Sequence, residues 1–149
     1  MSIDDSETIV VPSVLMGAVT VRQSDLFRFP VGLPGFESCR TFALVPSGRE
    51  QLWWLQSAER ADLVFLVVDP FHFFPGYQVD LQPAELATLG ASPDSTLMVL
   101  AIVTLPRTEQ EAPTANLRAP LFLDVERREG RQVVLSDERY HVQMAFSLE

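Results

Sequence analysis

The sequence predicts an all-β, mainly antiparallel fold: a small β-barrel-like domain that carries one short helix. Short runs of β-branched and aromatic residues, about eight along the chain, are separated by clusters of Gly, Pro, Ser and Asp, as in barrels and sandwiches. Only one segment has the pattern of a helix, and strands do not alternate with helices, which argues against an α/β sheet. We expect residues 1–149 to form a single domain, because a chain of this length buries most of its surface on folding.

The first half of the chain holds most of the predicted strands. Residues 1–12 are polar and acidic, and we expect them to be flexible. Trp53 and Trp54 are neighbours in one strand and should therefore point to opposite faces. The continuous apolar run at 63–68 predicts a central strand covered on both faces. The strands predicted in this half are 14–21, with Gly17 at a bulge, then 26–29, 40–45, 52–57 and 63–68, and turns occupy 30–36.

The second half begins with a short extended piece at 78–81 and the one predicted helix at 83–89. Pro83 suits the first turn of that helix, and Gly90 suits the position just after its end. Residues 97–105 form the longest apolar run, and their length and Val, Ile and Thr content favour a strand. We expect this strand to be the spine of the core.

The last part of the chain predicts a hairpin and an irregular tail. Strands at 119–125 and 132–135 flank a charged turn in which Gly130 should have a positive φ. Residues 106–113 are polar and predict a loop. The tail after Ser136 has no clear periodicity, and we expect 141–149 to be flexible.

The segment 69–80 concentrates aromatic residues between backbone breakers. Phe71, Phe73, Phe74 and Tyr77 fall within seven positions, and the prolines among them have no N–H to donate to a central strand. We therefore expect a sheet edge or a rim loop. If it is extended, Phe71 and Phe73 share one face and Phe74 takes the other. The rings either close one end of a barrel or contact a partner.

Charge and composition narrow the classes of function. The formal net charge is −9, which disfavours nucleic acid and anionic membranes and favours a basic partner protein. Cys39 is the only cysteine, which suits a reducing compartment. The N-terminus does not resemble a secretory signal, and no apolar run is long enough for a membrane helix. We expect a cytoplasmic protein that needs no cofactor.

Signals for catalysis are weak. His72 and His141 lack metal-binding spacing, and none of the common hydrolase, nucleotide or zinc motifs is present. His72 is more simply explained as a rim histidine among aromatics, and Cys39 as a small packing residue. Asp69 and Asp80 are better explained as turn and strand-end residues than as an acid–base pair. We therefore expect no enzymatic activity.

Three groups of motifs, in this order and spacing, resemble the family of the flagellar assembly factor FliW. They are FPVGLPGFE at 29–37, VDPFHFFPGY at 68–77, and TANLRAP at 114–120 followed by GRQVVL at 130–135. The resemblance runs from about Gly17 to Tyr140. It implies a small β-barrel-like protein without enzymatic activity. It also implies two partners, flagellin and the basic RNA-binding translational regulator CsrA, which compete for the protein.

The resemblance further implies a feedback loop. When flagellin is exported, the released protein captures CsrA, discourages its RNA binding allosterically and relieves repression of flagellin translation. We expect no direct binding of nucleic acid or membrane, and a monomer when the protein is free.

Candidate partner-binding residues follow from their chemistry, and each also has a structural interpretation. Rim aromatics are good interface anchors, although each phenylalanine taken alone is more simply explained by packing in the core. The carboxylates would supply charge or serve as turn residues, and Asn116 would bind its own backbone or that of a partner. The candidates are Phe36, Glu37, Asp69, Phe71, Phe73, Phe74, Tyr77 and Asn116.

An alternative function uses the same aromatic stretch, residues 71–77. A small β-barrel could stack single-stranded RNA on these rings or hold an apolar ligand. RNA binding also needs a basic groove, and the arginines available for one, Arg118, Arg127, Arg128 and Arg131, are interrupted by Glu126 and Glu129.

Overall fold

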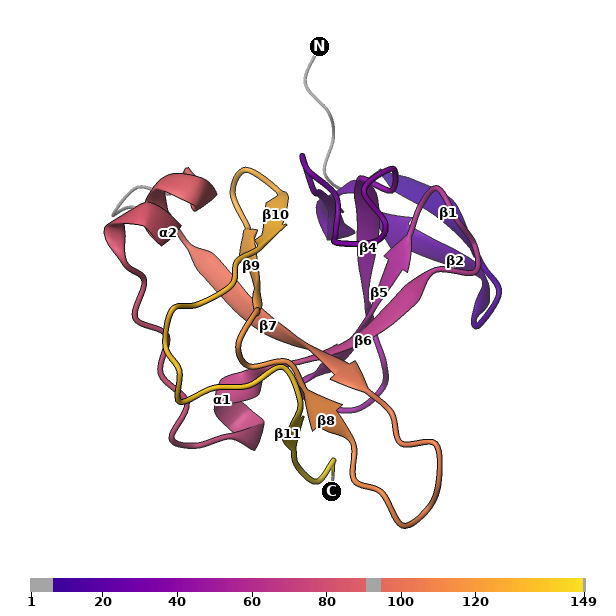
Figure 1. The fold of residues 1–149 in the computed structure, drawn as a ribbon. Coiled ribbons are helices and arrows are strands. Elements are labelled where there is room, and N and C mark those ends of the chain that lie inside the picture. The colour runs from indigo at the N-terminus through magenta and orange to yellow at the C-terminus, as the bar shows by residue number, and fades with distance from the viewer. Residues whose placement is uncertain (1–6, 91–94, 149) are drawn as a thin grey trace.

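The structure, a computed structural model, describes residues 7–90 and 95–148. Seven strands close into a barrel, which confirms the predicted all-β, mainly antiparallel fold class (Figure 1). All but one of the neighbouring pairs are antiparallel. In order around the ring, the strands are β3 (Leu26–Arg28), β4 (Thr41–Pro46), β5 (Leu52–Ser57), β6 (Val64–Val68), β7 (Leu97–Thr104), β9 (Leu121–Asp124) and β10 (Glu129–Gln132).

The barrel closes at a parallel contact between β3 and β10, where Arg28 is paired with Glu129. The hairpin formed by β9 and β10 has other strand bounds than the sequence predicted. Its second strand begins at Glu129 rather than Gln132, and the positive φ, 56°, belongs to Arg128 and not to Gly130. Gly130 is instead required by packing, since a Cβ there would lie 2.5 Å from the Phe29 ring.

Strand β7 is the centre of the sheet, as predicted for 97–105. One of its edges pairs with β6. Its other edge pairs first with β9 over Leu97–Leu100 and then with β8 (Thr114–Ala115). Strand β11 (Met144–Ala145) then pairs with β8 and ends the sheet. Strands β8 and β11 were not predicted from the sequence, because two-residue strands have no measurable period.

The N-terminal segment also forms a hairpin that was not predicted. Strand β1 (Thr8–Ser13) pairs with β2 (Gly17–Arg22), so the residues between them are the turn and not part of a strand. Gly17 has a φ of 75° and ends that turn. Val11 and Val21 of the hairpin pack against Ala43 on the outside of β4. The predicted flexibility of 1–12 and 141–149 stays a prediction.

Two apolar clusters lie on opposite sides of the barrel wall. Phe65 and Val67 of β6 pack in the barrel interior, and Leu66 and Val68 pack in a second cluster outside it. The continuous apolar run at 63–68 therefore has both faces covered, as predicted. Trp53 and Trp54 divide in the same way, with Trp53 against the interior and Trp54 against the outer cluster.

The predicted helix is α2 (Pro83–Leu89), and Gly90 ends it in the left-handed conformation with a φ of 63°. One turn of helix, α1 (Pro70–Phe73), follows β6, and a 3-10 turn, η1 (Gln23–Asp25), follows β2. Within the described ranges, no helix has the length and apolar character needed to cross a membrane.

Candidate functional site

The aromatic segment folds back as a helical turn directly after β6, where a sheet edge or rim loop was predicted. Asp69 caps α1, because its carboxylate accepts a hydrogen bond of 2.9 Å from the Phe71 N–H. Pro70 occupies the first turn, where its missing N–H is harmless. The role of Asp69 in this structure is therefore that of a helix cap.

The helical turn changes which rings share a face. Phe73 and Phe74, predicted on opposite faces, both contact Phe146, with ring centroids 5.4 and 5.3 Å away. Phe71 instead lies 5.4 Å from Tyr77 and keeps 44% of its surface exposed. Phe71 and Phe73 were expected to share a face only in an extended segment, and that condition is not met because Pro70–Phe73 is a helical turn.

Two tyrosines form the base of this arrangement. The rings of Tyr77 and Tyr140 are 4.7 Å apart and edge to face. The Tyr77 hydroxyl donates to the carbonyl oxygen of Leu117 at 2.8 Å, and the Tyr140 hydroxyl accepts from the Gln78 N–H at 2.9 Å. Burial raises the pKa of Tyr77, and the charges of Tyr140 and Asp137 raise it further. Tyr77 is thus a buried, neutral anchor.

We call the rings gathered here, those of Phe71, Phe73, Phe74, Tyr77, Tyr140 and Phe146, the aromatic cluster. An apolar hollow of about 320 Å³ opens beside it. The hollow is lined by Phe73, Phe74, Pro75, Gly76, Tyr77, Leu117, Tyr140 and Met144. A shallow apolar hollow edged by rings is suited to contact with a protein side chain.

Asn116 lies next to the cluster in the chain, just before Leu117. Its side-chain oxygen accepts a hydrogen bond of 2.9 Å from the Ala119 N–H, so it stabilises a turn of its own backbone. This contact matches the first of the two roles considered for Asn116.

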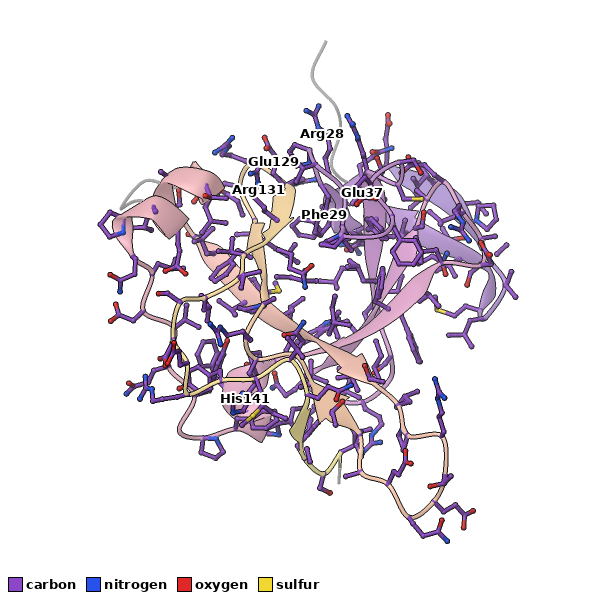
Figure 2. The ribbon with its side chains drawn as sticks, viewed as in Figure 1. Arg28, Phe29, Glu37, Glu129, Arg131 and His141 are labelled. Carbon is purple, nitrogen blue, oxygen red and sulfur yellow. The ribbon has the colours of Figure 1, made fainter. Side chains whose placement is uncertain are left out.

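Phe36 and Glu37 lie away from the aromatic cluster. Phe36 packs on Phe65 near the start of β6, whereas α1 follows the end of that strand. In Figure 2, Glu37 lies at the end of the barrel opposite His141. The Glu37 carboxylate accepts from the Gly35 N–H at 3.1 Å, and backbone hydrogen bonds lower its pKa. The structure therefore does not join the eight candidates into one site.

The residues considered for catalysis are also dispersed. Cys39 is buried in the barrel interior, as a packing residue would be. His72 is exposed, and its ring meets Phe73 edge to face at 4.8 Å. Within 7–90 and 95–148, no three His, Cys, Asp or Glu side chains gather in a way that could hold a metal ion.

Residues that sequence reasoning missed come from the C-terminal tail. Met144, Phe146 and Leu148 all pack against the outer apolar cluster. The large apolar residues at alternate positions from Met144 to Leu148 were a strand signal, but one too short to stand out.

Comparison with known proteins points to one family. A family model described as FliW protein matches residues 10–146. The flagellar assembly factor FliW of Moorella thermoacetica is 37% identical over 125 residues, which cover 83% of this chain and 79% of that protein. FliW of Symbiobacterium thermophilum is 38% identical over 120 residues, covering 79% and 86%.

A solved structure shows the same similarity in three dimensions. It is described as the crystal structure of the flagellar assembly factor FliW. It superposes with a TM-score of 0.81 at 29% identity, covering 91% of this chain and 95% of that one.

Proposed function

The chain belongs to the FliW family of flagellar assembly factors, and from this premise we propose that it is a cytoplasmic binding protein for flagellin and CsrA. It holds flagellin while flagellin awaits export. When flagellin leaves, the chain captures CsrA and lowers the affinity of CsrA for RNA allosterically, so that flagellin translation resumes. The protein is a monomer when free and has no catalytic role.

The observation that carries this proposal is the aromatic cluster with its apolar hollow. Phe71 stands 44% exposed beside the buried Tyr77, and Phe73 and Phe74 edge the hollow. Rigid aromatic side chains at the edge of an apolar hollow are typical anchors of protein interfaces. We assign flagellin, the partner that must be held and later released, to this surface.

The net charge of −9 supports the second partner. CsrA is basic, so opposite fields speed the encounter of the two proteins. A bound acidic protein also places negative potential near the RNA site, which opposes phosphate groups. By linkage, RNA must lower the affinity of CsrA for this chain by the same factor by which the chain lowers the affinity for RNA.

The arrangement of the rings gives less support to single-stranded RNA. Stacked bases need open ring faces, but Phe73 and Phe74 are in contact with Phe146, and Tyr77 is buried. Arg28, Arg127 and Arg131 line a different hollow, of about 270 Å³, together with Asp124 and Glu129. If the chain binds neither protein, the alternative that it binds an apolar small molecule in the 320 Å³ hollow is favoured.

The test is binding of the purified chain to purified flagellin and to purified CsrA, separately and in competition. We expect both to bind, flagellin to displace CsrA, and the CsrA affinity to fall as NaCl rises from about 50 to 500 mM. In a separate titration with RNA, the chain alone should show no binding. Binding to neither protein would overturn the proposal.

A further inference from the structure

The C-terminal segment Met144–Leu148 lies on the body of the protein in the way a bound peptide lies on a sheet edge. Strand β11 pairs with β8 at only two positions, Met144 with Ala115 and Ala145 with Thr114. In Figure 1, β11 lies beside β8 close to the C-terminal end of the chain. The segment ends the sheet, so removing it would unpair only β8.

Its side chains alternate in the pattern of an added strand. Met144, Phe146 and Leu148 are partly buried against the outer apolar cluster, while Gln143, Ala145 and Ser147 are exposed. The Phe146 ring contacts those of Phe73 and Phe74, with centroid distances of 5.4 and 5.3 Å. Met144 lines the apolar hollow. Three apolar side chains at alternate positions therefore cover the outer apolar cluster, and Phe146 among them covers Phe73 and Phe74.

Hydrogen bonds outside the pairing with β8 also hold this segment. The Phe146 N–H donates to the Pro113 carbonyl at 3.1 Å, and the Arg49 guanidinium donates to the Leu148 carbonyl at 2.6 Å. The anchor lies just upstream, where the His141 carbonyl accepts from the N–H groups of Leu117 and Arg118, both at 3.2 Å. Because β8 and β11 lie outside the ring of seven barrel strands, release of the segment after His141 would leave the pairing of the barrel strands in place.

Release would expose two features together. One is the outer edge of β8, whose backbone groups would then lack strand partners. The other is the pair Phe73 and Phe74 with the hollow beside them. An edge plus pockets for alternate side chains is what recognition by β-strand addition requires.

We propose that Met144–Leu148 is an exchangeable strand. A partner's extended segment, with apolar side chains at three alternate positions, takes its place on β8. The chemistry of the partner's segment is inferred from Met144, Phe146 and Leu148, the side chains that cover this surface in the structure. The inference rests on the proposed function in that flagellin is the partner expected to supply such a segment.

The experiment locks the strand in place with a disulfide. Thr114 and Ala145 are directly paired across β8 and β11, so the double variant T114C/A145C can form the bond on oxidation, while the native Cys39 is buried. We expect the oxidised variant to bind flagellin at least tenfold more weakly than the same protein after reduction. The matched control is V10C/T20C, which locks a directly paired position in the N-terminal hairpin and should bind equally well in both states.

A second measurement does not depend on flagellin. A labelled peptide of sequence HVQMAFSL, residues 141–148, is titrated into the full chain and into its F146S variant, whose own segment is weakened. We expect at least tenfold tighter peptide binding to F146S, and none when the three apolar positions of the peptide are serine.

The outcomes separate the two proposals. Equal flagellin binding by locked and reduced protein, or equal peptide binding by F146S and the parent chain, overturns strand exchange and leaves the proposed function standing. If the reduced variant and the parent chain both fail to bind flagellin, the proposed function fails, and the peptide titration alone decides strand exchange.

Discussion

Gly130 lies directly against the ring of Phe29, where β10 and β3 close the barrel. A Cβ at position 130 would lie 2.5 Å from the Phe29 Cζ atom and 2.6 Å from Leu123 Cδ2. Phe29 and Leu123 are both fully buried, so neither side chain has space into which it can move. Figure 2 places Phe29 close to Arg28 and Glu129, the pair that joins the two strands.

The variant G130A should therefore be destabilised. We expect a loss of about 1–3 kcal/mol in the free energy of unfolding, because overpacking a close-packed core forces strained rotamers or backbone shifts. Urea denaturation measures it. The control is G76A, because a methyl group at Gly76 would meet no atom within 4 Å and the backbone there has no positive φ. Equal stability of the two variants would show that a side chain fits at position 130, where β10 and β3 close the barrel.

Tyr77 is expected to make stability depend on pH in the alkaline range. Its pKa is raised in the folded state by burial, whereas in the unfolded chain it ionises near pH ~10. Above that pH the unfolded state loses the proton first, so stability falls as the pH rises. Below pH ~10, the substitution Y77F should lower the free energy of unfolding by about 1 kcal/mol, because the Leu117 carbonyl loses its hydrogen bond from the Tyr77 hydroxyl.

The difference between the parent chain and Y77F should then shrink between pH 9 and about pH 11.5, since only the parent has this group to titrate. Chemical denaturation at several pH values measures both curves. Parallel curves would contradict the assignment of a buried, neutral Tyr77.

Gln56 organises the connection between β5 and β6. Its side-chain nitrogen lies 3.0–3.3 Å from the carbonyl oxygens of Ser57, Arg60, Ala61 and Leu63, and the residue is fully buried. Q56L keeps the approximate volume but leaves buried carbonyl groups without this donor. We expect a loss of about 1–3 kcal/mol in unfolding free energy.

The exposed residue Gln78 offers the comparison for that substitution. Q78L should change stability by less than about 0.5 kcal/mol, as is usual for a surface position. A small effect at both positions would mean that water replaces the Gln56 amide at the carbonyl groups.

The sequence indicated the barrel better than it indicated the site. The two-sided run at 63–68 and the long strand at 97–105 were predicted because their patterns are local and strong. The one-turn helix α1 was missed, although Asp69 followed by Pro70 is a helix-start signal, because the prolines were interpreted as edge residues. The contact of Phe146 with Phe73 and Phe74 joins segments about seventy residues apart, which no local pattern reveals.

A substitution at Phe71 tests whether this end of the barrel binds flagellin. The side chain is 44% exposed, so F71A should leave the fold intact while removing an anchor. Its control is V134A, which truncates an apolar side chain that is 67% exposed and is not among the members of the outer apolar cluster. In a calorimetric titration with purified flagellin, we expect F71A to weaken binding by about 1–2 kcal/mol, roughly five- to thirtyfold, and V134A to bind like the parent chain. Unchanged flagellin affinity in a well-folded F71A protein would show that flagellin does not bind at this surface.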